Sequence, residues 1–267
     1  MSPDEVLAWA PGFVAGEIQF IERIKHGLTN DSWRVTSDRA DLVVRRGNAS
    51  EASLQIDRAS ESAVLELVAA AHLGPEVIVN DPAQRVLITR YAGPTWTPTQ
   101  ALDVSNIDRL AAVFARLHAL DAPEQVQRLD LDRVVIGYLT TLAEHDAAAS
   151  LRALALQARA THTIEMLRRE SDACLCHNDV HALNIVDGSE LRLIDWEYAG
   201  IGEPFFDLAS VCVYHTYDRR RRQRLLSSYS ALANDDAYRR LELCCWLFEY
   251  VRDLWIAVRE LNDIRQR

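Results

Sequence analysis

The chain has 267 residues, of which 49% are hydrophobic, and a net charge of −10 at pH 7. This length allows one large domain or two lobes, and the acidic balance argues against nucleic-acid binding while mildly favouring cationic ligands. No apolar run reaches the roughly 20 residues that span a membrane, so we expect no membrane insertion. Residues 1–11 are acidic and lack the apolar core of a signal peptide. Cys174-x-Cys176 and Cys244-Cys245 lack zinc spacing, which favours reduced thiols and a cytoplasmic protein.

The first third of the chain is predicted to be rich in β-structure. After a short helix at 3–10, apolar periodicity and turn residues predict several strands and one helix. The strands are expected at 17–25, 32–36, 42–45, 77–79 and 86–91, and the helix at 53–72. The bend at 26–31 leaves backbone N–H groups that suit phosphates, although a plain hairpin turn is the alternative.

The remainder of the chain is predicted to be mainly helical. Amphipathic patterns indicate helices at 107–120, 129–144, 150–169, 204–217, 219–232 and 236–262. A boundary is expected at Tyr91-Ala92-Gly93-Pro94, which gives a β-rich N-terminal lobe (1–92) and a helical C-terminal lobe (93–267). The predicted fold class is therefore α+β with two lobes.

One stretch carries most of the chemistry. Asp179 stands in a polar loop, Asn184 follows five residues later, and Asp195 ends the next apolar run. The turn Asp187-Gly188-Ser189-Glu190 joins two short strands in a hairpin, which brings the polar side chains toward one end. One acid to deprotonate a hydroxyl and an Asn/Asp pair to hold Mg²⁺ are what phosphoryl transfer needs.

The same residues resemble a known family. His177-x-Asp179-x-x-x-x-Asn184, the segment 194–200 and the segment 206–209 are similar to motifs of the aminoglycoside phosphotransferase and choline kinase superfamily. The closest motifs are those of bacterial thiamine kinases and choline/ethanolamine kinases. The resemblance implies a protein-kinase-like fold, with a nucleotide-binding N-terminal lobe and a catalytic, acceptor-binding C-terminal lobe. It also implies ATP- and Mg²⁺-dependent phosphorylation of a hydroxyl group.

Site residues follow from the matching positions. The resemblance implies that Asp179 is the catalytic base and touches the acceptor, while Asn184 and Asp195 bind Mg²⁺. Nucleotide-binding residues are expected at Thr29, Asn30, Arg45, Glu61, Arg90, Tyr91 and Ala92. The resemblance implies that Arg45 replaces the usual lysine and pairs with Glu61. Strand alternation makes Arg46 face away from Arg45, so only one of them can reach the cleft, and the family pattern favours Arg45. Further acceptor-binding residues are expected at Trp196, Glu197, Tyr250 and Trp255.

The acceptor is expected to be a small, cationic metabolite. Choline kinases usually carry a second tryptophan three residues after the position of Trp255, but here that residue is Val258. Thiamine therefore ranks above choline and ethanolamine, and an aminoglycoside or a sugar is the alternative.

Several residues have other readings. Asp207 is expected to bind the backbone of the catalytic loop, and Glu197 fits a surface salt bridge as well as a substrate contact. Arg219-Arg220-Arg221-Arg222 is expected to be a solvated helix face. His177-x-Asp179-x-His181 with Asp195 also fits a zinc or manganese hydrolase. A non-catalytic nucleotide-binding module is a further alternative.

Overall fold

The computed structural model describes residues 16–24, 30–47, 54, 56–170, 173–230 and 233–265. The helix predicted at 3–10 and residues 26–29 of the predicted bend lie outside these ranges. The chain forms two compact units. The first contains Met1–Trp96 and Leu183–Glu197, and the second contains Thr97–Ala182 and Tyr198–Arg267. The hairpin that follows the loop of Asp179 thus belongs to the first unit, whereas a single division after residue 92 stays a prediction.

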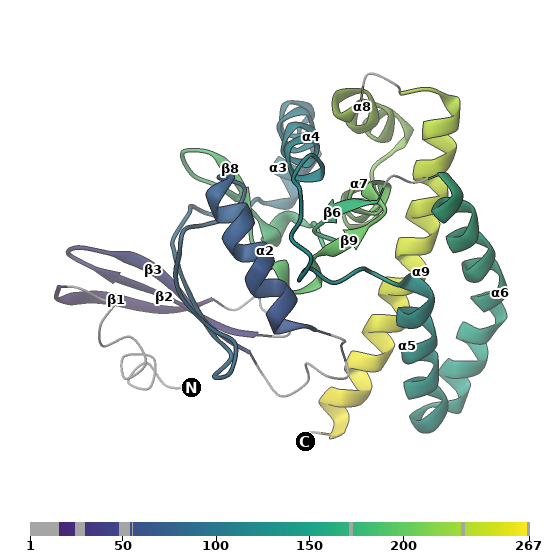
Figure 1. The fold of residues 1–267 in the computed structure, drawn as a ribbon, viewed down its shortest axis with the longest axis horizontal. Coiled ribbons are helices and arrows are strands. Elements are labelled where there is room, and N and C mark those ends of the chain that lie inside the picture. The colour runs from purple at the N-terminus through teal and green to yellow at the C-terminus, as the bar shows by residue number, and fades with distance from the viewer. Residues whose placement is uncertain are drawn as a thin grey trace. The chain divides into compact units, whose positions relative to one another are not determined.

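The first unit is built on one antiparallel sheet with strand order β1-β2-β3-β5-β4 (Figure 1). Its strands are β1 (Ile18–Ile24), β2 (Asn30–Ser37), β3 (Asp41–Gly47), β4 (Val77–Asp81) and β5 (Val86–Arg90). Alternate residues of the three central strands point to one face and form a buried cluster. The cluster consists of Trp33, Val35, Leu42, Val44, Val86 and Ile88.

Helix α2 (Arg58–Ala70) packs beside β4 and begins later than predicted. Its start is set by Asp57, whose carboxylate accepts hydrogen bonds from the backbone N–H groups of Ala59 and Ser60. This cap places Glu61 in the first turn of the helix, where its side chain is buried.

The hairpin β7 (Ile185–Asp187) and β8 (Leu191–Leu193) is joined to the first unit by backbone hydrogen bonds. The N–H of Trp96 donates to the carbonyl of Ile185, and the N–H of Leu193 donates to the carbonyl of Leu73. Its turn requires glycine, because a Cβ at Gly188 would lie 2.2 Å from the carbonyl oxygen of Ala92. The two hydrogen bonds hold the open end of the hairpin, and the close approach of Gly188 to Ala92 holds its turn.

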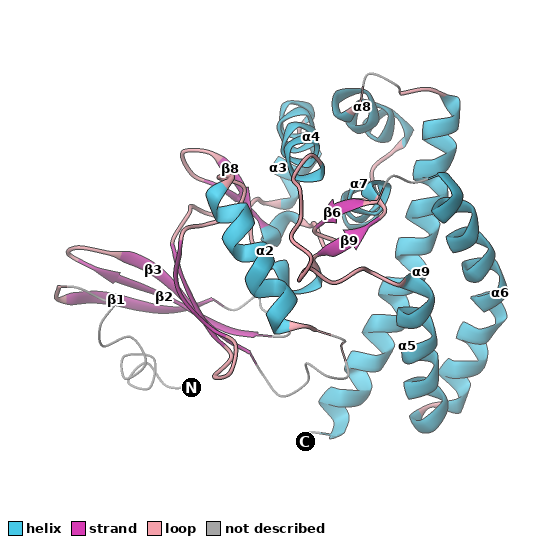
Figure 2. Cartoon of the chain, in the orientation of Figure 1, coloured by secondary structure: helices cyan, strands magenta, loops and turns pink. Residues whose placement is uncertain are grey.

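The second unit is mainly helical (Figure 2). Its helices are α3 (Pro98–Leu102), α4 (Val104–His118), α5 (Leu131–His145), α6 (Ala147–Glu170), α7 (Pro204–Tyr214), α8 (Arg219–Tyr229) and α9 (Asp235–Arg265). Helices α5, α6 and α9 contact one another, α7 packs on α9, and α8 packs on α4. A short strand, β6 (Cys174–Cys176), pairs with β9 (Gly200–Gly202). The β-rich first unit and the helical second unit confirm the predicted α+β class.

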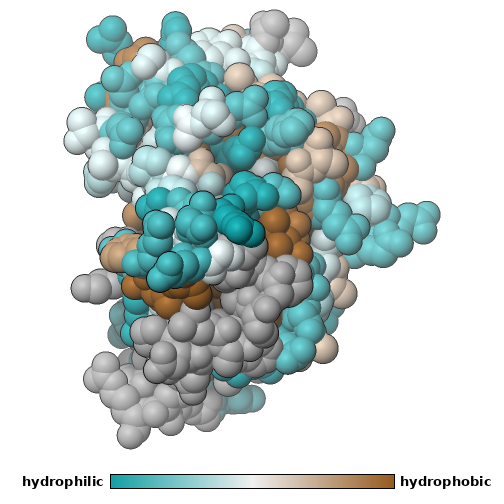
Figure 3. Space-filling model, turned by 90° about the vertical axis from the view of Figure 1, so that its left-hand side faces the viewer, coloured by the Kyte–Doolittle hydropathy of each residue, from teal (hydrophilic) through white to brown (hydrophobic). Residues whose placement is uncertain are grey.

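The surface carries many polar side chains, as expected of a chain in which 25% of the residues are charged (Figure 3). The face drawn in Figure 3 is mainly hydrophilic, and hydrophobic residues show in small areas between polar ones. Among the described helices, none combines the length and the apolar character needed to cross a membrane.

Candidate active site

Arg45 on β3 connects two carboxylates of the first unit. Its Nη2 lies 2.6 Å from Oε1 of Glu61, and its Nη1 lies 3.0 Å from Oδ1 of Asp195. The predicted pair of Arg45 and Glu61 is therefore present, and Arg46 is exposed on the opposite side of the strand. Burial alone lowers the pKa of Arg45, but the carboxylates around it raise the pKa overall. The guanidinium is thus held as a fixed positive charge.

The network continues through Arg58, which the sequence analysis did not identify. Arg58 binds the second oxygen of Glu61 at 2.6 Å and the carboxylate of Glu197 at 3.3 Å. Burial raises the pKa of Glu61, but Arg45 and Arg58 lower it overall. One signal for Arg58 was available: it stands three residues before Glu61, the spacing that puts two residues on one helix face.

Glu197 is a buried member of this network. Its side chain is 2% exposed and accepts a hydrogen bond of 2.8 Å from Nδ2 of Asn30. The reading of Glu197 as a surface salt bridge was wrong, because its partners Arg58 and Asn30 lie inside the first unit. These contacts favour a role in positioning Asn30, which is itself a predicted nucleotide-binding residue.

Asn184 and Asp195 lie at the same end of the β7–β8 hairpin. Ile185 pairs with Leu193 in the register of the hairpin, and the N–H of Ile194 donates to the carbonyl of Asn184 at 3.0 Å. Asp195 follows directly, with a positive φ of 66° that aspartate tolerates better than most residues. One carboxylate and one amide oxygen are donors that Mg²⁺ accepts.

The loop that carries Asp179 is held by Asp207 on α7. The carboxylate of Asp207 accepts hydrogen bonds from the backbone N–H groups of His177 at 2.9 Å and Asn178 at 2.6 Å. This confirms that Asp207 binds the loop backbone. Asn178 has a φ of 67°, and its side chain donates to the carbonyl of Tyr198. The loop conformation is therefore fixed on both sides of the turn that presents Asp179.

The Asp179 carboxylate is 23% exposed and has a tyrosine beside it. The hydroxyl of Tyr214 donates to Oδ1 at 2.8 Å, and Nε2 of His181 lies 3.8 Å from Oδ2. Burial lowers the pKa of His181 to about 4, so this histidine is neutral at pH 7. Sequence reasoning missed Tyr214, because a single tyrosine in a buried helix gives no signal of its own.

A second neutral histidine supports the end of this loop. Nε2 of His215 accepts a hydrogen bond of 3.1 Å from the N–H of Ala182. Burial, and then the nearby His181, lower the pKa of His215 to about 4. An imidazole that accepts at Nε2 must be unprotonated there, so the hydrogen bond and the low pKa agree.

The metal-hydrolase alternative requires His177, Asp179 and His181 to share one metal ion. Among the residues that the structure describes, His177, Asp179 and His181 do not form a group with ligand atoms within 4.8 Å of one another. Nδ1 of His177 instead accepts from the N–H of Asp179 at 3.4 Å. A shared metal between these side chains is therefore not supported.

Two of the three expected aromatic acceptor residues are buried in the units that contain them. Trp196 is 1% exposed, and its indole N–H donates to the carbonyl of Leu193 inside the first unit. Tyr250 is 5% exposed, donates to the carbonyl of Ala153 and stacks on Trp246. These two side chains pack within their own units. The polar atom of each donates to a backbone carbonyl, and the ring of Tyr250 also stacks on Trp246. Trp255 is half-buried and donates to the Tyr198 hydroxyl at 2.9 Å.

The remaining nucleotide-binding predictions lie at the end of β5 and beyond. Arg90 is exposed and pairs with Glu76, and the N–H of Tyr91 donates to the carbonyl of Asp41. Ala92 lies against Gly188 at the hairpin turn. Thr29 falls outside the described residues, so its role stays a prediction.

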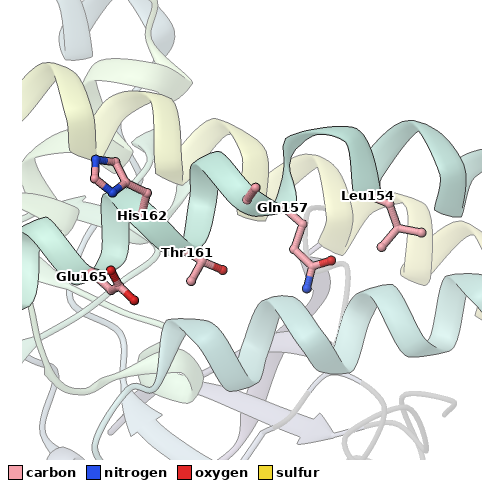
Figure 4. Close-up of a pocket in the computed structure, with 6 residues that line it drawn as sticks. Leu154, Gln157, Thr161, His162 and Glu165 are labelled. Carbon is pink, nitrogen blue, oxygen red and sulfur yellow. The ribbon is translucent and has the colours of Figure 1, made fainter.

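A shallow recess runs along α6 in the second unit (Figure 4). It is lined by Leu154, Gln157, Ala158, Thr161, His162 and Glu165. No predicted site residue lines this recess, so it has no part in the site described above.

The sequence matches a protein-family model described as the phosphotransferase enzyme family over residues 21–244. The chain belongs to this family. A thiamine kinase of Salmonella newport is 48% identical over 62 residues, which cover 23% of this chain and 22% of that protein. The match thus spans less than a quarter of the curated relative.

Solved structures share the fold over nearly the whole chain. Choline kinase LicA from Streptococcus pneumoniae is 18% identical with a TM-score of 0.83, covering 96% of this chain and 90% of that one. A choline/ethanolamine kinase family protein from Mesorhizobium loti is 26% identical with a TM-score of 0.80, covering 98% and 88%. The predicted protein-kinase-like fold is confirmed by these similarities.

Proposed function

We propose that this protein transfers the γ-phosphoryl group of ATP to a hydroxyl of a small, cationic metabolite. The observation that carries the proposal is Arg45, which joins Glu61 and Asp195. In kinases of this fold a basic residue on the third strand pairs with a helix glutamate and binds nucleotide phosphates, and a nearby aspartate binds magnesium. The first unit reproduces that arrangement with arginine in place of lysine.

Asp195 and Asn184 would hold Mg²⁺ in this proposal. When bound, the metal neutralises charge on the β- and γ-phosphates. The donors fit, because Mg²⁺ takes oxygen ligands and commonly binds one or two carboxylates together with phosphates and water. The Asp195 side chain is 31% exposed, which leaves it accessible to a cation while Arg45 fixes one of its oxygens.

Asp179 would accept the proton of the attacking hydroxyl. The hydrogen bond from Tyr214 orients its carboxylate, and Asp207 fixes the loop that carries it. His181 is neutral and 3.8 Å away, so it does not neutralise the carboxylate at pH 7. A general base held in this way is suited to proton transfer from an alcohol.

The acceptor is proposed to be choline or ethanolamine, with thiamine second. This reverses the order reached from the sequence alone. The thiamine kinase match covers 62 residues, whereas the 26% identical choline/ethanolamine kinase family protein is similar over 98% of this chain. A match of 62 residues is too short to include the whole helical unit, whereas the longer match covers nearly the whole chain.

The test is ADP release with ATP and Mg²⁺ across a panel of acceptors, with an Asp179→Asn variant as the inactive control. The panel contains choline, ethanolamine, thiamine, an aminoglycoside and a hexose. Choline or ethanolamine is expected to give the highest kcat/KM. ADP release only with the aminoglycoside or the hexose would overturn the acceptor assignment, and ester hydrolysis with Zn²⁺ but no ADP release would overturn the kinase assignment.

The charge requirement is tested with 3,3-dimethylbutanol, the neutral carbon isostere of choline. A cation beside an aromatic ring gains about 0.5–2 kcal/mol, or roughly two- to thirtyfold in affinity. Because Trp255 is the one predicted aromatic acceptor residue that is not deeply buried, we expect a preference for choline near the lower end of this range. Equal kcat/KM for the two alcohols would contradict a cationic acceptor.

A further inference from the structure

Two thiols and one imidazole meet in the second unit, directly before the loop that carries Asp179, and none of the three has a part in the proposed reaction. They belong to His118 at the end of α4 and to Cys174 and Cys176 on β6, and all lie within 4.8 Å of one another. The two sulfurs are 3.9 Å apart. Residues i and i+2 of a strand point to the same face, which explains why both thiols face the histidine while Leu175 is buried on the other side.

We propose that His118, Cys174 and Cys176 bind a thiophilic divalent cation, with Zn²⁺ as the natural candidate. Zinc binds thiolate sulfur at about 2.3 Å in tetrahedral sites, which places two sulfur ligands about 3.8 Å apart. The observed 3.9 Å between the sulfurs already matches that edge. The sequence alone shows no zinc spacing, because the third donor comes from a helix far from Cys174 in the chain.

The histidine is oriented as a metal ligand. Its Nε2 lies 3.0 Å from Oδ2 of Asp207, and its Nδ1 lies 2.9 Å from the hydroxyl of Tyr229. Histidines that bind metals usually donate the other ring N–H to a carboxylate, which fixes the tautomer. Asp207 therefore holds the Nε2 proton and Nδ1 binds the cation in place of the Tyr229 hydroxyl. The two thiol protons pass to solvent on binding.

The electrostatic surroundings also favour a cation. The Asp207 side chain is fully buried and sits directly behind the histidine. The His118 side chain is only 6% exposed, whereas Cys174 is partly exposed, so an ion would reach the donors past Cys174. Asp207 also accepts hydrogen bonds from His177 and Asn178, so the cation would be coupled to the anchor of the catalytic loop.

The experiment uses Co²⁺ as a spectroscopic probe of the full-length, reduced protein. We expect one equivalent to bind, with thiolate-to-cobalt charge-transfer absorption and the intense visible bands of tetrahedral cobalt, and we expect Zn²⁺ to displace it. Cys174→Ser is expected to weaken binding at least tenfold and to reduce the charge-transfer absorption. His118→Gln is expected to weaken binding without removing that absorption, because both thiolates remain.

The matched control is Cys245→Ala. Cys245 lies beside Cys212, yet among the described residues these two thiols are not joined by a third metal donor. Cobalt binding is expected to be unchanged in this variant. Circular dichroism and the unfolding transition establish that each variant is folded. Absence of thiolate-to-cobalt bands in the wild type would overturn the proposal. The same bands and affinity in folded Cys174→Ser would also overturn it and would indicate an adventitious ion only.

Discussion

The carboxylates of the two units differ in what holds them. In the first unit Glu61 and Asp195 are bound to guanidinium groups, so their negative charge is matched by fixed positive charge. In the second unit Asp179 accepts a hydrogen bond from Tyr214 and has a neutral histidine nearby. The comparison shows how one side-chain type serves two tasks. The carboxylates of the first unit hold Arg45, which can bind phosphates, and Asp195 can bind a cation, whereas Asp179 is suited to accepting a proton.

The largest expected effect is that of Asp195→Ala. The change removes the proposed magnesium carboxylate and one partner of Arg45, so phosphoryl transfer is expected to fall below detection. Turnover with ATP, Mg²⁺ and choline is the measurement. Asp81→Ala, which removes a partly exposed acid of the same unit, is the control and should retain activity. Activity above one tenth of wild type in Asp195→Ala would place the metal elsewhere.

Asp179→Asn is expected to lower kcat by about 10²- to 10⁴-fold, because the amide keeps the size of the side chain but cannot take the proton. Tyr214→Phe is the companion variant. It keeps the carboxylate and removes only the hydrogen bond that orients it, so its loss is expected to be much smaller. Near-normal kcat in Asp179→Asn would sink the assignment of the base.

Glu61→Gln is expected to destabilise the protein by about 3 kcal/mol, because the largely buried guanidinium groups of Arg45 and Arg58 would lose a negative charge that neutralises them. The free energy of unfolding from denaturant titration is the measurement. Glu76→Gln is the matched control, since Glu76 binds Arg90 at the same 2.6 Å but both side chains are more than half exposed. That pair is expected to contribute at most about 1 kcal/mol. Equal losses in the two variants would contradict the buried network.

A smaller effect is expected in the pH dependence of stability. The folded pKa values of His181 and His215 lie at about 4, below the usual 6.5, so the unfolded chain binds more protons between these values. Their contribution to stability is therefore complete above about pH 6.5 and is lost as the pH falls toward 4. His215→Gln should reduce the slope of unfolding free energy against pH in this window by up to about 1.4 kcal/mol per pH unit. An unchanged slope would show that this histidine titrates normally.

The parts of this account that the sequence could predict are local. Strand alternation put Arg45 and Arg46 on opposite faces, and the family resemblance then selected Arg45. Turn residues identified the β7–β8 hairpin that brings Asn184 to Asp195. The strand β9 was missed, because Gly200 and Gly202 give no strand pattern. Glycine is needed there, since a Cβ at Gly200 would lie 2.9 Å from the carbonyl oxygen of Gln127.

The parts that could not be predicted depend on tertiary packing. Tyr214 and His215 reach the catalytic loop only because α7 packs against it. Trp196 and Tyr250 were expected to contact the acceptor, since aromatic residues near a motif suggest a cage. Their burial instead follows from contacts with Leu193 and Ala153. Sequence spacing gives no information on such contacts between distant segments.

The central claim is a division of labour, in which Asp195 binds the metal–nucleotide and Asp179 acts on the acceptor. The most direct test is calorimetric binding of Mg-ATP to wild type, Asp195→Ala and Asp179→Asn, in the absence of acceptor. We predict that Asp179→Asn binds Mg-ATP within about twofold of wild type, whereas Asp195→Ala binds it at least tenfold more weakly, because it lacks the metal carboxylate. Normal Mg-ATP binding by Asp195→Ala, or its loss in Asp179→Asn, would contradict the account.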